Sequence, residues 1–204
     1  ENRGYTVGYS ETMKDPLWVY YTLKESEASN ERLSRPKGGF ETDTRTKAQI
    51  TTHDYVGSGY DRGHMAPSYA IGKYHDRDAQ IGTFVMSNIV PQSHYCNDGV
   101  WNSIERMEAD DFTKRFKSIE VVDGPVFDAN PTRLPSGVAI PSAFYKVIKR
   151  PDGQLIAFLV PQYPESPNPE AYLTTVDEIQ KRTGIDIFPE ATAEQKSKVR
   201  KNIW

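Results

Sequence analysis

Runs of β-branched and aromatic residues, separated by turn-forming residues, predict several strands along the chain. Residues 17–23 have the composition of a buried strand, and residues 118–122 form a second candidate that an Asp-Gly-Pro sequence stops. Residues 138–149 and 154–160 flank Arg-Pro-Asp-Gly, which is typical of a turn between two antiparallel strands. The pattern therefore favours a sheet whose neighbouring strands run in opposite directions.

Helical periodicity begins at Asn97. Apolar residues return every three or four positions from there, with Trp101 and Glu105 on an adjoining stripe. The main stripe comprises the apolar residues Val100, Ile104 and Met107 and continues to the acidic Asp111. Asn97 is a residue type that caps helix starts, so we expect the helix to begin there.

Two further helices are predicted from their start signals. Thr175 and Glu178 have capping-box spacing and open a helix that Gly184 ends. Thr192 and Gln195 repeat the spacing and open a last short helix.

Polar and proline-rich stretches fill the remaining chain. Residues 26–47 predict a surface connection with a short strand near Phe40, and residues 161–169 predict a loop. No internal repeat divides the sequence, so we expect one domain over residues 1–204. The predicted fold class is α+β, with a mainly antiparallel sheet flanked by helices.

Composition narrows the functional classes. The chain of 204 residues has a net charge of −3, so nucleic-acid binding would require a local basic cleft. Its longest clean apolar run, residues 155–160, is too short to span a bilayer, so no membrane partner is expected. A single cysteine, Cys96, excludes an internal disulfide and any zinc site built from cysteines. Cys96 itself has two interpretations, a small buried residue or a thiol for redox chemistry or dimer formation.

A first candidate site lies in Asp61-Arg62-Gly63-His64. A histidine can take a proton from water near neutral pH, and an arginine can hold a phosphate through two hydrogen bonds. The alternative is a polar turn in which Asp61 pairs with Arg62. The other histidines, His53, His75 and His94, form no metal-binding pair at helical spacing and receive no role.

A second candidate site combines Asn88 with the polar residues of the helix that starts near Asn97. Asn97, Trp101 and Glu105 are spaced one helical turn apart, and an amide oxygen with a nearby carboxylate can hold a hydrated Mg²⁺. The alternative makes Asn97 a helix cap, Trp101 a core residue and Glu105 one half of an ion pair with Arg106 or with a more distant cation.

Both clusters, together with much of the rest of the sequence, resemble the DNA/RNA non-specific endonuclease family of ββα-metal nucleases. This family includes the endonuclease G group. The matching segments are Tyr-Val-Gly-Ser-Gly-Tyr-Asp-Arg-Gly-His at 55–64, Met-Ser-Asn-Ile-Val-Pro-Gln at 86–92 and Asn-Asp-Gly-Val-Trp-Asn-Ser-Ile-Glu at 97–105. The likeness covers nearly the whole chain.

The resemblance implies a ββα-metal site and a metal-dependent hydrolase that cuts DNA and RNA to 5′-phosphate and 3′-hydroxyl ends. It implies that His64 is the general base, that Asn97 is the one direct ligand of a single Mg²⁺ or Mn²⁺, and that Glu105 acts through the metal's waters. The remaining implied site residues are Arg62 on the phosphate, Asn88 on the site or the phosphate, and Asp61, which orients its neighbours.

One further phosphate contact is ambiguous. The family has another arginine upstream of the Asp-Arg-Gly-His motif, and Arg35 and Arg45 are both candidates for it. Either can instead be an ordinary surface charge.

The resemblance also leads us to expect particular binding partners and a particular cellular compartment for this protein. DNA and RNA are the substrates, family members often dimerise, and an inhibitor protein is a further candidate partner. The chain does not begin with Met, and the family is often exported, so we expect a secreted or periplasmic protein. The rival function is a catalytically silent or partner-regulated protein on the same fold, which holds nucleic acid or a protein partner without cutting. If the pKa of His64 is unshifted, activity should fall on acidification with a midpoint near about 6.5.

Overall fold

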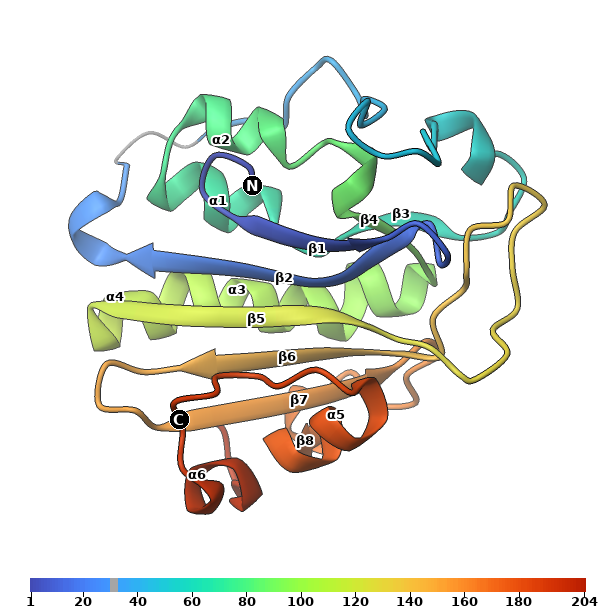
Figure 1. Cartoon of the computed structure of the whole chain (residues 1–204). Coiled ribbons are helices and arrows are strands. Elements are labelled where there is room, and N and C mark those ends of the chain that lie inside the picture. Colours follow the sequence, from blue (N-terminus) through green and yellow to red (C-terminus); the bar gives the residue numbers. More distant parts are fainter. Residues whose placement is uncertain (30–32) are drawn as a thin grey trace.

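The computed structural model describes residues 1–29 and 33–204 and contains two antiparallel sheets (Figure 1). The larger sheet has the strand order β1-β2-β5-β6-β7-β8, and β3 pairs with β4 in a separate small sheet. The strands are β1 (Thr6–Ser10), β2 (Asp15–Lys24), β3 (Asp61–His64), β4 (Ile89–Gln92), β5 (Ser118–Val126), β6 (Ala143–Lys149), β7 (Leu155–Pro161) and β8 (Leu173–Thr174). The α-helices are α1 (Ser68–Tyr74), α2 (Arg77–Gly82), α3 (Asn102–Met107), α4 (Thr113–Phe116), α5 (Val176–Thr183) and α6 (Ala193–Ser197).

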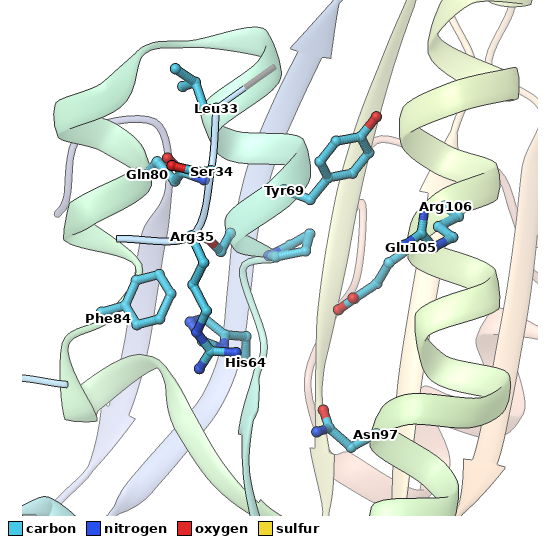
Figure 2. Close-up of a pocket in the computed structure, with 12 residues that line it drawn as sticks. Leu33, Ser34, Arg35, His64, Tyr69, Gln80, Phe84, Asn97, Glu105 and Arg106 are labelled. Atoms are coloured by element: carbon cyan, nitrogen blue, oxygen red, sulfur yellow. The ribbon is translucent and has the colours of Figure 1, made fainter. Parts of the chain in front are cut away.

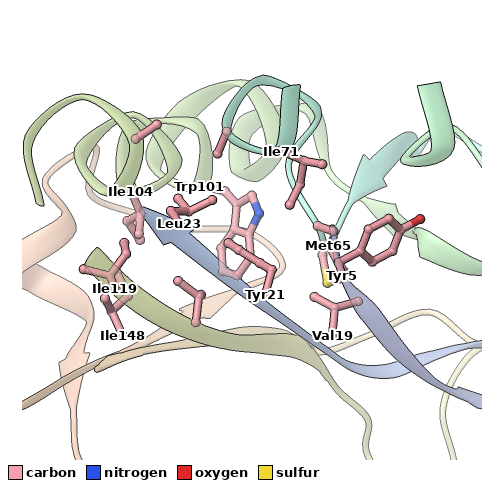
Figure 3. Close-up of a cluster of buried hydrophobic side chains, with 14 of the residues drawn as sticks. Tyr5, Val19, Tyr21, Leu23, Met65, Ile71, Trp101, Ile104, Ile119 and Ile148 are labelled. Carbon is pink, nitrogen blue, oxygen red and sulfur yellow. The ribbon is translucent and has the colours of Figure 1, made fainter. Parts of the chain in front are cut away.

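The larger sheet is covered on both faces because side chains alternate along its strands. On β2, Tyr21 and Leu23 pack into the cluster that includes Trp101 and Ile104 from the helix behind the sheet (Figure 3). Trp18 and Tyr20 point to the opposite face, where they pack with residues of α5 and the segment after it. This alternation with period two places α3 on one face of the sheet and α5 on the other.

The helix predicted from Asn97 extends well beyond one α-helix. It runs through η4 (Cys96–Trp101), which is kinked at Gly99 where the backbone is not helical, then α3, a π-helical segment η5 (Glu108–Phe112) and α4. Asn97 does not cap it: helical residues begin at His94, and Ser93 Oγ accepts a hydrogen bond from the Cys96 N–H at 3.2 Å. The cap assignment was therefore wrong, and the side chain of Asn97 is available for other contacts.

The small sheet brings the Asp-Arg-Gly-His motif beside this helix. Asp61 pairs with Gln92 and His64 with Ile89 in the β3–β4 register. A Cβ atom at Gly63 would lie 2.2 Å from Gln92 Oε1, so only glycine fits between its neighbours here.

Most of the predicted elements are present. β2, β5 and the β6–β7 hairpin are confirmed, and Thr175 Oγ1 accepts a hydrogen bond from Glu178 N at the start of α5. Three strand predictions were wrong. Asp-Gly-Pro at 123–125 does not stop the second strand, because β5 continues through it to Val126 and stays paired with β6. Residues 138–142 precede β6 without forming a strand, and beside Phe40 there is only an isolated bridge from Glu41 to Val85. Part of the predicted 26–47 connection lies outside the described residues.

In the part of the chain that the structure describes, no helix has the length and apolar character needed to cross a bilayer.

Candidate active site

His64 ends β3 and lies against two phenylalanine rings. Its ring centre is 5.4 Å from that of Phe40 and 4.7 Å from that of Phe84, which it meets edge-on. Its Nε2 atom is buried and has no hydrogen-bond partner among residues 1–29 and 33–204. The ring is thus held by packing, and one polar nitrogen remains unpaired.

Burial and the nearby charge of Arg35 lower the pKa of His64 to about 3. The imidazole is therefore neutral at neutral pH, which is the form that accepts a proton. The condition of an unshifted pKa, on which a midpoint of about 6.5 depended, is not met, because the apolar surroundings of the ring disfavour its charged form.

Asn88 lies behind His64, and its amide is bonded to the backbone. Its Oδ1 accepts a hydrogen bond from Ala66 N at 2.9 Å, and its Nδ2 donates to Ala66 O and Thr83 O, both at 3.0 Å. The residue is fully buried. It holds the chain just after His64 and does not line the cavity described below.

Asn97 and Glu105 project from the helix toward His64 (Figure 2). Asn97 Nδ2 donates to Asp61 Oδ2 at 3.0 Å, which fixes the amide and leaves Oδ1 without a partner in the described part of the chain. Asp61 Oδ2 also accepts from His94 Nδ1 at 3.0 Å. Burial raises the pKa of Asp61, but the hydrogen bonds from Asn97 and His94 outweigh it, so the pKa lies below its ordinary value.

Glu105 lies two helical turns from Asn97. Burial raises the pKa of its carboxyl to about 8, although the charge of Lys146 opposes this shift. The alternative in which Glu105 pairs with Arg106 is not observed, since no ion pair of Glu105 occurs within the described residues.

These residues share a cavity of about 620 Å³. Its lining includes His64, Asn97, Glu105 and Arg35 from the predicted set (Figure 2). The other lining residues are Leu33, Ser34, Pro67, Ser68, Tyr69, Gln80, Phe84 and Arg106. The two clusters separated in sequence thus form opposite walls of one site.

The candidate phosphate-binding arginines fall into two groups. The guanidinium carbon of Arg35 lies 5.2 Å from the Phe84 ring centre, and that of Arg62 lies 5.3 Å from the Phe40 ring centre. Both arginines are exposed and stack on the rings that contact His64. Arg62 does not line the cavity itself and stands beside it.

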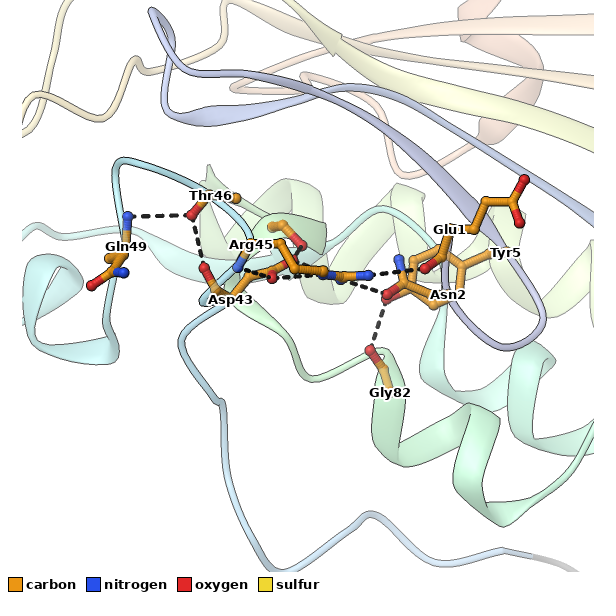
Figure 4. Close-up of polar contacts among 9 residues, drawn as sticks. Glu1, Asn2, Tyr5, Asp43, Arg45, Thr46, Gln49 and Gly82 are labelled. Atoms are coloured by element: carbon orange, nitrogen blue, oxygen red, sulfur yellow. Dashed lines mark hydrogen bonds and ion pairs between the residues drawn. The ribbon is translucent and has the colours of Figure 1, made fainter.

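Arg45 belongs to a different site (Figure 4). Its guanidinium bonds both carboxylate oxygens of Asp43, at 2.8 and 2.7 Å, and also donates to Glu1 O and Asn2 Oδ1. These hydrogen bonds lower the pKa of Asp43 to about 2 against the effect of burial. Arg45 fastens the start of the chain to the loop after Phe40 and is already paired.

The residues at the cavity fit a hydrated divalent ion with few protein ligands. Within the described residues, no group of three or more His, Cys, Asp or Glu side chains could hold a metal. The oxygen of Asn97, which has no partner among the described residues, and the carboxylate of Glu105, which forms no ion pair there, instead offer one direct oxygen ligand and one partner for metal-bound water. Mg²⁺ suits this set because it keeps several of its waters.

Sequence reasoning missed three contributors to the site. Phe40 and Phe84 surround His64, but they lie far from it in sequence, so no local signal was available. His94, which contacts Asp61, is three positions before Asn97, and this helical spacing was a usable signal.

Cys96 is fully buried, and burial raises the pKa of its thiol to about 12, as expected for a small core residue.

A family model described as DNA/RNA non-specific endonuclease matches residues 1–194. The chain belongs to this family. The family consists of metal-dependent nucleases, so the sequence-based prediction of a nuclease-family enzyme is confirmed.

Individual nucleases of the family align over most of the chain. The mitochondrial nuclease EXOG of Xenopus laevis is 33% identical over 210 residues, covering 91% of this chain and 57% of that protein. Mitochondrial endonuclease G of Homo sapiens is 28% identical over 210 residues, covering 93% of this chain and 69% of that protein. The chain thus spans less than two thirds of the length of the EXOG relative.

A solved structure of the family has the same fold. In a crystal structure of the EndoG/EndoGI complex that describes inhibition of EndoG, the matched chain has a TM-score of 0.82 and 26% identity. The match covers 96% of this chain and 87% of that chain. The predicted α+β class with a mainly antiparallel sheet is confirmed.

The expectation of an exported protein was wrong. It rested on the first residue and on the habit of export in part of the family. The EXOG and endonuclease G relatives, and a further relative from Saccharomyces cerevisiae, are named as mitochondrial nucleases.

Proposed function

We propose that this chain is a metal-dependent endonuclease that hydrolyses DNA and RNA to 5′-phosphate and 3′-hydroxyl products. The observation that carries the proposal is one shared cavity, with a histidine of lowered pKa on one wall and the Asn97 amide oxygen and the Glu105 carboxylate on the other. Residues 1–204 would act as one nuclease unit, since elements from both halves of the sequence build this cavity or its supports.

His64 serves as the general base in this proposal. Its lowered pKa keeps the imidazole unprotonated, so it can take a proton from the attacking water. Phe40 and Phe84 fix the ring, and Asn88 holds the backbone that follows it. Asp61 orients the Asn97 amide across the cavity.

The phosphate is bound by arginine. Arg35 lines the cavity next to His64, and Arg62 stacks on the shared Phe40 ring, so both can present planar donors to phosphate oxygens. We assign the upstream phosphate contact to Arg35 and not to Arg45, because the guanidinium of Arg45 is paired with Asp43.

One Mg²⁺, with Mn²⁺ as a substitute, would be held by Asn97 Oδ1 directly and by Glu105 through water. When bound, this ion stabilises negative charge on the phosphate and the leaving oxygen. The residues that hold it are fixed before it binds, Asn97 through Asp61 and Glu105 through its place in α3.

Protein partners form a separate part of the proposal. The EndoG chain of similar fold was solved with EndoGI, and this supports a search for an inhibitor protein of the present nuclease. A second copy of the chain is another candidate partner, and measuring the oligomeric state in solution tests for this homodimer.

The test is cleavage of plasmid DNA and of RNA with Mg²⁺, with a chelator, and with His64→Ala. We expect the chelator to stop both reactions and His64→Ala to lower the rate about 10²–10⁴-fold, the usual contribution of a general base. Exposed His53 provides a matched control, and His53→Ala should cleave like the parent protein. Intact substrate with folded parent protein in Mg²⁺ would contradict the proposal and favour a protein that binds nucleic acid without cutting it.

A further inference from the structure

Arg106 lines the candidate site but has no role in the chemistry proposed above. It follows Glu105 on α3, and its side chain is exposed at the wall of the 620 Å³ cavity (Figure 2). No ion pair, hydrogen bond or ring contact of Arg106 occurs in the described portion of the chain. It is therefore a cation without a neutralising partner inside a site for a polyanion.

The neighbours of Arg106 on the helix explain why its charge is not neutralised. Side chains three or four positions away are the ones that meet on a helix. Those of Arg106 are Asn102, Ser103 and Ala109, which carry no charge, and Asp110.

Asp110 is already paired with α1. Its Oδ1 accepts hydrogen bonds from Lys73 Nζ at 2.7 Å and from the Tyr69 hydroxyl at 2.8 Å. These contacts pair Asp110 with α1 and join α1 to the helix. Tyr69, which also lines the cavity, thus helps to keep the guanidinium of Arg106 free.

The cavity extends from His64 and Arg35 on one side to Tyr69 and Arg106 on the other. We have placed the scissile phosphate with Arg35, beside His64. Arg106 follows Glu105 on the opposite wall (Figure 2), so a strand that lay along the cavity would present another phosphate to it.

We propose that Arg106 binds a phosphate adjacent to the scissile one and forms a subsite for the neighbouring nucleotide. The inference rests on the proposed nuclease function and adds a residue that grips the strand without touching the reacting atoms. Because the contact is the same before and in the transition state, it strengthens substrate binding more than it accelerates the chemical step.

The experiment compares Arg106→Gln with the parent protein on a short oligonucleotide that contains one preferred cleavage position. We expect KM to rise about three- to tenfold, as for loss of a partly exposed charge-assisted contact, with kcat nearly unchanged. The dependence of log(1/KM) on log salt should lose about 0.7 of its slope, the share of one phosphate contact on a single strand. Arg106→Lys should retain most of the parent's affinity, because it keeps the charge.

Two matched controls separate a local contact from a change of net charge. Arg182→Gln removes the same charge from α5, which packs on the opposite face of the sheet, and should leave KM and the salt slope unchanged. In the second control, one phosphate next to the cleaved bond is replaced by a neutral methylphosphonate. This should raise KM for the parent protein and not raise it further for Arg106→Gln.

The outcomes distinguish the two proposals. A folded parent protein that cuts no substrate contradicts the nuclease function itself. A parent protein that cuts, with Arg106→Gln and Arg182→Gln behaving alike, contradicts the subsite alone. Additive losses from Arg106→Gln and the methylphosphonate at each neighbouring position would also contradict it.

Discussion

On one wall of the cavity His64 packs against two phenylalanine rings, whereas on the other Glu105 is influenced by the charges of a group of buried side chains. In that group, Lys146 Nζ is 2.6 Å from Asp123 Oδ2 and 3.1 Å from Glu108 Oε2, and all three side chains are fully buried. The same nitrogen lies 5.0 Å from the Trp101 ring centre.

The two walls shift pKa values in opposite directions for the same physical reason. Burial disfavours charge, so it lowers the pKa of His64 and raises those of Glu105 and Asp123, the latter to about 7. Lys146 is the exception, because its carboxylate neighbours outweigh burial and raise its pKa. Apolar packing therefore keeps His64 neutral, whereas the charged forms of the buried carboxyl groups depend on the charge of Lys146.

Lys146→Met tests this dependence and should have the largest effect on stability. It leaves Glu108 and Asp123 buried without a counter-charge, and we expect the free energy of unfolding to fall by about 3–5 kcal/mol near pH 8. Lys149→Met, on the same strand, removes a lysine whose partners Glu120 and Glu190 are at least partly exposed, and it should lose only about 1 kcal/mol or less. Urea unfolding of both variants measures the difference.

The loss in Lys146→Met should also depend on pH. Without the lysine, the folded-state pKa values of both carboxyls rise further above their unfolded values. Groups of this kind stabilise the fold at low pH, and that contribution is lost as pH rises. The variant should therefore be less destabilised at pH 5 than at pH 8, and an equal loss at both values would show that Lys146 contributes by packing alone.

The helix wall was largely predictable from the sequence, because its information is local. The spacing of Asn97 and Glu105 places both on one side of a helix, and the structure brings both to the cavity. The cap interpretation of Asn97 failed because Ser93 occupies that role from a preceding turn. α1 was missed because it is short and Pro67 at its start makes no side-chain cap bond.

The histidine wall was predictable only in part. The Asp-Arg-Gly-His motif identified His64, but its pKa depends on Phe40 and Phe84, which reach it through tertiary packing. For the same reason, sequence could not separate Arg35 from Arg45. Only the fold shows that Arg45 is paired with Asp43 and that Arg35 lies beside His64.

The histidines themselves offer a second test of the comparison. The hydrogen bond and charge of Asp61 raise the pKa of exposed His94, whereas burial lowers that of His64 to about 3. In the metal-free protein, we expect an NMR titration to show His94 protonating above about 6.5 and His64 still neutral at pH 5. Protonation of His64 near about 6.5 would mean that the phenylalanine pocket opens in solution.

Arg35→Gln should produce the smallest of these effects, a change in the pKa of His64, and it tests how far Arg35 sets that pKa. The charge of Arg35 is the second cause of the lowered pKa of His64, after burial, so its removal should raise that pKa while leaving it below about 6.5. Arg45→Gln removes an equal charge that is already paired with Asp43, and it should leave the His64 titration unchanged. Phosphate bound to Arg35 would offset the same charge. Inorganic phosphate should therefore raise the pKa of His64 in the parent protein and not in Arg35→Gln, and equal shifts in both would remove Arg35 as the phosphate contact.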